Sequence, residues 1–167
     1  SSGHLVIGNH FLGIHNNNIL FEVFVHLGTL VAIFYFYKNE IFKTFKGIIT
    51  KQKESLNYLS LLIFATIPAV LIGVLFANQI KDFYNIQWVS IFFIITGIIL
   101  FLSKFSTTKQ SQITFFYAFI IGFSQAIAIL PGISRSGITI GVALLLGIHK
   151  AEATKFSFFM AIPVIIG

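Results

Sequence analysis

The sequence predicts an all-α integral membrane protein that crosses the bilayer several times, as its composition and hydropathy both indicate. Of its 167 residues, 56% are hydrophobic and 10% are charged, whereas about a quarter of the residues in a soluble domain are charged. The mean hydropathy is +0.92. Only helices and closed barrels satisfy the backbone in lipid, and the alternating pattern of barrel strands is absent from the sequence. An ordinary soluble fold is therefore excluded.

The apolar runs give the expected elements in chain order. A helix needs about 20 apolar residues to cross the hydrocarbon core, and residues 20–37, 56–77 and 86–102 meet this requirement. The run 113–130 is also uncharged, and 138–148 is apolar but short and rich in glycine. We expect these last two runs to enter the membrane and return. Two full spans are one arrangement, and the shortness of the second run favours a re-entrant helical hairpin.

The lysines predict the orientation. Nine of the ten lie in residues 38–55, 103–112 and 148–155, which fall on one side of the membrane in this arrangement, and Lys81 is the exception. Because loops rich in Lys and Arg stay in the cytoplasm, we expect that side to be cytoplasmic. The net charge of +6 is thus a topological signal, and no nucleic-acid partner is expected.

The only arginine lies in a polar string within apolar sequence, Pro131-Gly132-Ile133-Ser134-Arg135-Ser136-Gly137. An arginine at membrane depth is costly and usually faces a cavity and a partner. Its guanidinium fork matches phosphate or carboxylate oxygens, and a helix that begins just after it would favour an anion further. The string therefore predicts a phosphate-binding cradle. The alternative is an arginine that extends to lipid headgroups, beside serines that cap a helix.

The N-terminal residues repeat this theme in Ser1-Ser2-Gly3-His4. Ser2-Gly3 and Ser136-Gly137 each precede a Phe-rich segment by about 18 residues. Three spans, an odd number, separate the two units, so the second would have inverted topology. We expect one membrane domain over residues 1–167, with a first repeat over about 1–102 and the start of a second over about 113–167. Chance similarity in an apolar chain is the competing interpretation.

Two further residues are candidates for chemistry. His4 suits a general acid, a general base or a phosphate-binding cation, because histidine side chains titrate near neutral pH. Glu22 and His26 share one helix face at i, i+4. If that face points inward, Glu22 is a candidate catalytic base or metal ligand; otherwise it reaches water at the end of a span.

Pro131-Gly132-Ile133-Ser134-Arg135-Ser136-Gly137-Ile138-Thr139 resembles the signature of the bacterial undecaprenyl-diphosphatases of the bacitracin-resistance (BacA/UppP) type. The first loop of that family and the span after it resemble Ser1-Ser2-Gly3-His4-Leu5, Phe21-Glu22-Val23 and His26-Leu27-Gly28. The region after the second loop resembles Lys155-Phe156-Ser157-Phe158. The resemblance implies a membrane enzyme with two inverted repeats and two re-entrant hairpins. Such an enzyme hydrolyses undecaprenyl diphosphate to undecaprenyl phosphate, which recycles the lipid carrier for peptidoglycan synthesis and confers bacitracin resistance.

The same resemblance implies roles for individual residues. Arg135 would bind the diphosphate, His4 would be the acid/base or phosphate-binding histidine, and Ser1 would be a nucleophile or phosphate ligand. Further substrate contacts would come from Ser2, Gly3, Ser134, Ser136, Gly137 and Thr139. The implied cofactor is a divalent cation, Mg²⁺ or Ca²⁺. Family members carry an acidic Glu-x-x-x-Glu motif just before the Ser-Ser-Gly-His loop, so we expect this chain to be a fragment that lacks that motif and the closing helices. Such a fragment need not be active by itself.

The resemblance also implies a location and partners. We expect a multi-pass protein of the bacterial cytoplasmic membrane, with its site open to the extracytoplasmic side. The expected partners are a polyprenyl diphosphate lipid and membrane lipids, and a homodimer is left open. Two other functions compete with hydrolysis. A transporter or flippase of an anionic lipid or solute would use the same inverted-repeat site, and a membrane scaffold would use Arg135 only to bind headgroups.

Overall fold

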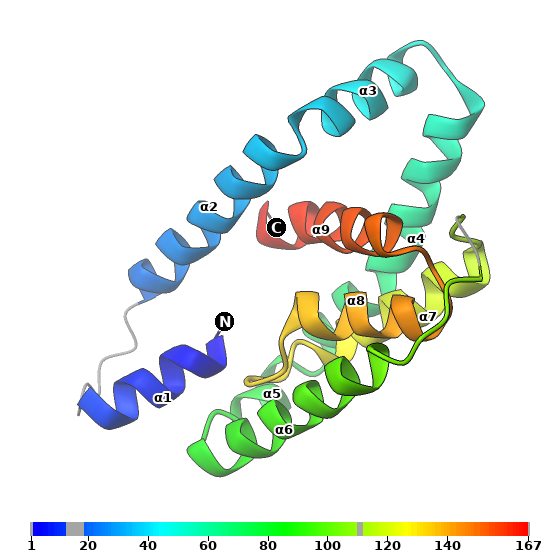
Figure 1. The fold of residues 1–167 in the computed structure, drawn as a ribbon. Helices are drawn as coiled ribbons and strands as arrows, with labels where there is room; N and C mark the ends of the chain where they lie inside the picture. Colours follow the sequence, from blue (N-terminus) through cyan, green and yellow to red (C-terminus); the bar gives the residue numbers. More distant parts are fainter. Residues whose placement is uncertain (1, 13–18, 110–111, 167) are drawn as a thin grey trace.

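The structure is a computed structural model that describes residues 2–12, 19–109 and 112–166. These residues form helices without any strand, in the order α1 (Ser2–Leu12), α2 (Ile19–Phe36), α3 (Lys38–Ile49), α4 (Lys53–Leu75), α5 (Ala77–Lys81), α6 (Ile86–Ser103), α7 (Phe115–Ile127), α8 (Arg135–Leu145) and α9 (Lys150–Ile166) (Figure 1). The all-α prediction is confirmed.

Helices α2, α4 and α6 correspond to the three predicted spans. Within the described residues, α4 and α6 are long and apolar enough to cross a membrane. Large apolar side chains point away from the protein on these helices: Val74 is 74% exposed and Phe101 is 62% exposed. Apolar surface of this extent marks contact with lipid or a partner rather than with water.

The run 113–148 forms a helical hairpin rather than two spans. Its limbs, α7 and α8, have 13 and 11 residues, which at a rise of 1.5 Å per residue gives lengths of about 20 and 17 Å. Both are short of the roughly 30 Å hydrocarbon core. The limbs pack against each other and are joined by a turn over residues 128–134. The inverted repeat remains a prediction.

Two segments expected as loops are largely helical. Residues 38–49 form α3, because Ile41, Phe45 and Ile48 lie on one helix face and Lys43 and Lys46 lie on the other. The tight turn that follows brings Gly47 of α3 against Ser55 of α4. Likewise, α9 begins at Lys150, inside the predicted loop 148–155.

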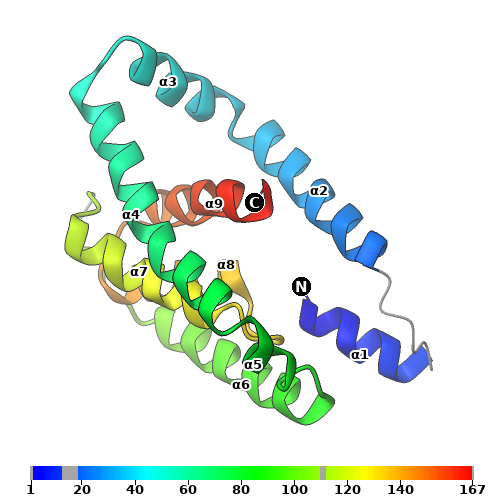
Figure 2. The ribbon, with the colours of Figure 1, turned by 180° about the vertical axis from the view of Figure 1, so that it is seen from behind.

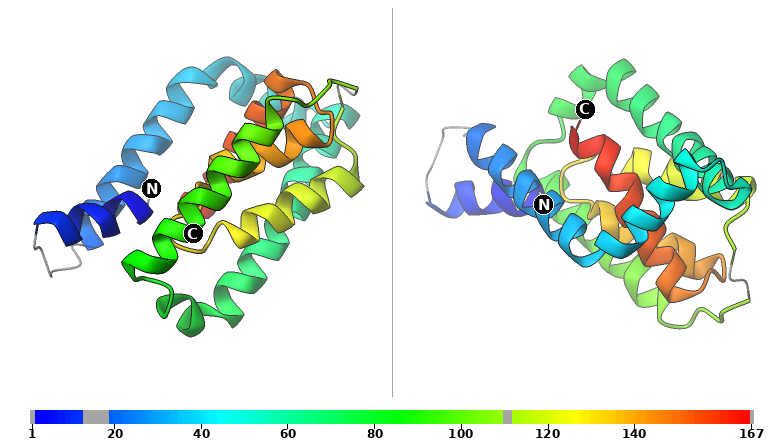
Figure 3. Two further views of the ribbon diagram at one scale, coloured as in Figure 1. Left: turned by 60° about the horizontal axis from the view of Figure 1, so that its bottom comes forward. Right: turned by 90° about the horizontal axis from the view of Figure 1, so that it is seen from above.

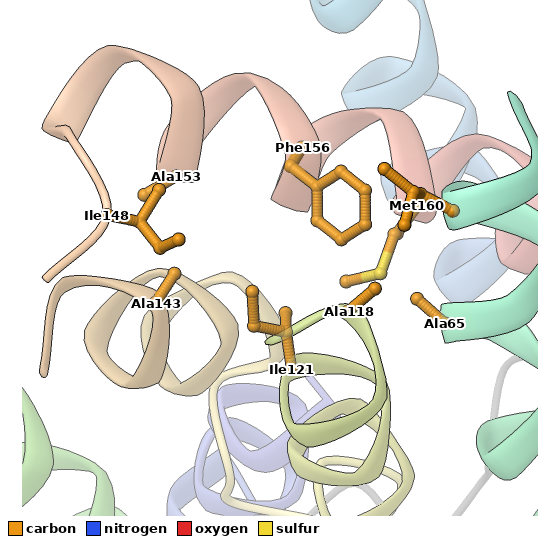
Figure 4. Close-up of a cluster of buried hydrophobic side chains, with 9 residues drawn as sticks. Ala65, Ala118, Ile121, Ala143, Ile148, Ala153, Phe156 and Met160 are labelled. Carbon is orange, nitrogen blue, oxygen red and sulfur yellow. The ribbon is translucent and has the colours of Figure 1, made fainter. Parts of the chain in front are cut away.

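The core lies where α4, α7, α8 and α9 meet. Helices α4 and α7 share the most extensive contact, and a Cβ on Gly122 of α7 would overlap the backbone of Ala65 on α4. Small residues allow membrane helices to approach this closely. Figure 4 shows the buried cluster, which comprises Leu61, Ala65, Ala118, Ile121, Ala143, Ile148, Ala153, Phe156 and Met160. This core fixes the hairpin against α4 and α9.

Helices α1 and α9 approach the hairpin from different sides. The N-terminal end of α1 points toward the turn between α7 and α8 in both Figure 1 and Figure 2. Helix α9 lies between α8 and the arm formed by α2 and α3 (Figure 3). Tyr37, at the junction of that arm, contacts the rings of Phe158 and Phe159 with centroids 5.8 and 5.9 Å away.

Candidate phosphate-binding site

The turn between α7 and α8 is anchored on helix α6. Gly132 has φ +101°, a left-handed conformation that only glycine adopts readily. A Cβ at this position would also come 2.6 Å from the carbonyl oxygen of Val89, so the turn lies directly on the backbone of α6. Two residues later, the N–H of Ser134 donates to Oγ1 of Thr96 at 3.2 Å. The geometry of the turn is therefore set by α6.

The N-terminus of α8 presents backbone donors at the end of this turn. Ser134 is the N-cap residue, and its hydroxyl accepts a hydrogen bond from the N–H of Gly137 at 3.2 Å. The hydrogen bond from the N–H of Ile138 to the carbonyl of Ser134 is 2.8 Å long. The N–H groups of Arg135 and Ser136 precede it and have no acceptor within the helix. Together with the helix dipole, they favour an anion here.

Arg135 is partly buried, and no carboxylate whose side chain the structure describes pairs with it. Its Nη1 donates to the carbonyl of Ala161 on α9 at 3.3 Å. A guanidinium has five N–H donors, so most of its donors remain available to another partner. A cation that is withdrawn from water without a carboxylate partner is costly. The arrangement therefore suits a bound anion with several oxygens.

The N-terminal segment Ser2-Gly3-His4 and the segment around Arg135 come together at the turn between α7 and α8, through Gly3. Gly3 is buried, and a Cβ on it would come 2.6 Å from the Cα of Gly132. The next residue, His4, is exposed, and its ring meets the ring of Phe93 on α6 edge-on, with centroids 4.9 Å apart. The structure thus brings Gly3 to the turn that precedes Arg135, and His4 to the neighbouring face of α6. This convergence joins segments about 130 residues apart in the chain.

Apart from Thr139, the remaining predicted site residues lie either in the first turn of α8 or where the structure does not describe their side chains. Ser136 is partly buried in the first turn of α8, and Gly137 packs on Ser134 and the methyl group of Thr96. Ser1 lies outside the described residues, and the side chains of Ser2 and Glu22 are not described.

Thr139 faces the protein interior. It has no exposed surface, and its hydroxyl donates to the carbonyl of Arg135 at 2.8 Å and lies 2.6 Å from the hydroxyl of Ser157 on α9. The family resemblance implies that Thr139 lines the diphosphate. In the structure its hydroxyl is engaged between α8 and α9, and contact with the diphosphate stays a prediction.

Sequence reasoning assigned no role to Thr96, Phe93 or Ser157. Thr96 and Ser157 are buried polar residues within apolar helices, and such residues usually hydrogen-bond between helices. A polar residue in an apolar helix is visible in the sequence, but the residue that it bonds on another helix is not. Phe93 has no signal, because it is one of 21 phenylalanines.

The described residues hold no cluster of typical metal ligands. Among them, no three His, Cys, Asp or Glu side chains gather as metal ligands would. Divalent Mg²⁺ and Ca²⁺ are bound through several oxygen ligands, with carboxylates prominent among them.

Comparison with known proteins identifies the family of the chain. Residues 1–167 match the family of Bacitracin resistance protein BacA. The chain is 42% identical over 173 residues to undecaprenyl-diphosphatase of Methanococcus maripaludis and 41% identical over 178 residues to undecaprenyl-diphosphatase 1 of Bacillus licheniformis. It is 43% identical over 170 residues to undecaprenyl-diphosphatase of Thermosipho africanus.

Each of these alignments covers the whole of this chain, and they cover 68%, 66% and 68% of the respective relatives. The chain thus spans about two thirds of their length. The resemblance carried by Ser1-Ser2-Gly3-His4 and by the string around Arg135 is confirmed, and the chain belongs to the BacA family of membrane proteins.

Proposed function

We propose that the protein hydrolyses undecaprenyl diphosphate to undecaprenyl phosphate and inorganic phosphate. The observation that carries this proposal is Arg135, a partly buried cation at the N-terminus of α8 with no carboxylate partner among the side chains that the structure describes. Its fork and the first N–H groups of α8 match the oxygens of a terminal phosphate. The curated relatives bear the name of this activity.

In this reaction the described residues bind and orient the terminal phosphoryl group. Catalysis of phosphoryl transfer is mainly positioning together with neutralisation of the charge on the transferred group. Arg135 and the N-terminus of α8 supply that neutralisation. An oxygen of a serine or of water attacks the terminal phosphorus, the bond to the bridging oxygen breaks, and the lipid monophosphate leaves. Attack by water gives inorganic phosphate directly, whereas attack by serine gives a phosphoserine that water then hydrolyses to serine and inorganic phosphate. His4, at the neighbouring end of α1, accepts the proton of the attacking hydroxyl or water.

The finer features of the family resemblance belong to the same proposal. We place the protein in the cytoplasmic membrane, with the α7–α8 turn open to the extracytoplasmic side, because nine of ten lysines lie on the opposite side in the predicted topology. Activity would depend on Mg²⁺ or Ca²⁺, with ligands outside the described residues. Helices α2, α4 and α6 would provide the spans around the hairpin.

The test separates hydrolysis from transport. The full-length protein is purified in detergent and incubated with undecaprenyl diphosphate, with and without a chelator, and inorganic phosphate and the lipid product are quantified. We expect equal amounts of phosphate and lipid monophosphate, and loss of both with chelator. If the metal-supplied, folded protein releases none but moves the lipid between leaflets of liposomes, the site is that of a transporter.

A further inference from the structure

Helix α9 holds Arg135 at two points one helical turn apart. Ala161 accepts a hydrogen bond from the guanidinium through its carbonyl oxygen, at 3.3 Å. Ser157, four residues earlier, contacts Thr139, whose hydroxyl bonds the main-chain carbonyl of Arg135. One face of α9 therefore contacts both the side chain of the arginine and, through Thr139, its backbone.

The two hydroxyls form a directed chain. The hydroxyl of Thr139 lies 2.8 Å from the carbonyl oxygen of Arg135 and 3.4 Å from that of Ser136, so its hydrogen serves the arginine carbonyl best. The hydroxyl of Ser157 lies 2.6 Å from Oγ1 of Thr139, and it is the donor of this hydrogen bond when the hydrogen of Thr139 points to the arginine carbonyl. This direction uses both hydrogens, and consecutive hydrogen bonds of this kind strengthen one another in a low dielectric.

The pair is sealed from solvent. Thr139 is 0% exposed and Ser157 is 4% exposed, and the neighbouring Phe156 and Met160 belong to the buried apolar cluster. A buried hydroxyl that loses its partner keeps an unsatisfied hydrogen-bonding group away from water, which is unfavourable. The chain of two hydrogen bonds therefore holds the first turn of α8 in a fixed position against α9.

We propose that Ser157 is a positioning residue for the phosphate site: through Thr139 it fixes the N-terminal turn of α8, and so aims the guanidinium of Arg135. This inference rests on the proposed function, since it concerns the same site. It assigns Thr139 to the support of the arginine rather than to contact with the phosphate. Displacement of a charged donor by about 1 Å can cost a hundredfold in rate.

The experiment compares S157A with a matched control, S124A, in the full-length protein. Ser124 is also a buried serine, but its hydroxyl bonds only the carbonyl of Ile121 in its own helix, at 2.6 Å. We expect S157A to lower kcat/KM about tenfold to a hundredfold at temperatures where the variant is folded. We expect S124A to stay within about twofold of wild type. Equal activity of the two variants would overturn the proposal.

If S157A does not fold, variants at Thr139 test the same hydrogen-bond chain independently. T139V keeps the shape of the side chain and removes the hydroxyl, whereas T139S keeps the hydroxyl. We expect loss of activity in T139V and near wild-type activity in T139S. Wild-type activity in T139V would overturn the proposal.

A double-mutant cycle separates positioning from general stability. If Ser157 acts through the guanidinium, S157A causes no further loss of residual activity in an R135K background. If Ser157 serves only stability, S157A lowers the rate by the same factor in both backgrounds, which would contradict the proposal.

Binding of inorganic pyrophosphate distinguishes failure of this inference from failure of the proposed function. The readout is the increase in melting temperature that pyrophosphate causes. We expect a clear increase in wild type and S124A, a smaller one in S157A, and none in R135A. If wild type binds in this manner but hydrolyses no lipid diphosphate, the proposed function fails and the positioning role stands. If S157A binds as S124A does, the positioning role fails.

Discussion

At the scale of single residues, the site depends on polar groups that bond across helices. Thr96 is the link between α6 and the turn, because its oxygen accepts the N–H of Ser134 at 3.2 Å while its hydroxyl donates to the carbonyl of Phe92 at 3.0 Å. The N–H of Ser134 lies at membrane depth in the predicted topology. Without Thr96 this partly buried donor would lose its acceptor within the protein.

We therefore predict that T96V destabilises the protein by about 1–2 kcal/mol and lowers kcat/KM. T96S, which keeps the oxygen, should behave as wild type. The matched control is S90A on the same helix, since Ser90 is exposed and bonds only the carbonyl of Ile86 at 2.8 Å. Thermal unfolding in detergent and phosphate release measure the two effects. A T96V protein as stable and active as S90A would refute the role of Thr96.

Gly3 provides a second test at the scale of single residues, because the N-terminal segment contacts the α7–α8 turn through it. A Cβ on Gly3 would come 2.6 Å from the Cα of Gly132, whereas one on Gly8, in the same helix, would meet nothing within 4 Å. We predict that G3A moves α1 off the turn and lowers kcat/KM at least about tenfold, while G8A has little effect. Equal rates for the two variants would show that the contact is unimportant for activity.

At the scale of helices, close packing of α4 on α7 places the hairpin. Hydropathy predicts that these helices exist and places their ends to within a few residues, since an apolar run is a local property of the sequence. It does not predict which helices pack against each other. The contact of Gly122 with Ala65 and the bond of Arg135 to Ala161 join distant segments, and no single-sequence pattern specifies such pairs.

We predict that G122A destabilises the protein by about 1–3 kcal/mol, because its Cβ would overlap the backbone of Ala65. The control is G97A in α6, where a Cβ would meet nothing within 4 Å. There alanine should be neutral or stabilising by up to about 1 kcal/mol, owing to its higher helix propensity. Unfolding curves in detergent decide the matter, and a G122A protein more stable than G97A would contradict this packing.

At the scale of the whole molecule, the sequence predicts the class of protein and the chemistry of the turn better than the arrangement of its parts. The signature around Arg135 is contiguous, so it is readable without a structure. The convergence of Gly3 on Gly132, and the burial of Thr139 against Ser157, arise only when α1 and α9 pack around the hairpin. The amphipathic helix α3 is not predicted from the sequence, because its lysines are also typical of a cytoplasmic loop.

The predicted topology is testable because the 167 residues contain no cysteine. Single cysteines replace Thr108 and Asn78, both exposed residues, the first between α6 and α7 and the second in α5. A membrane-impermeant maleimide should label T108C only from the cytoplasmic side and N78C only from the opposite side. Labelling of both positions from one side would contradict the three-span arrangement.

The central claim is that Arg135 binds the terminal phosphate of a lipid diphosphate during hydrolysis. Its most direct test is phosphate release from undecaprenyl diphosphate by the full-length protein, by R135A, by R135K and by the control K104A, in which the exposed Lys104 is removed. We predict that R135A lowers kcat/KM about a thousandfold or more, that R135K does not restore it because lysine lacks the planar fork, and that K104A resembles wild type. An R135A protein within about twofold of wild type would contradict the account.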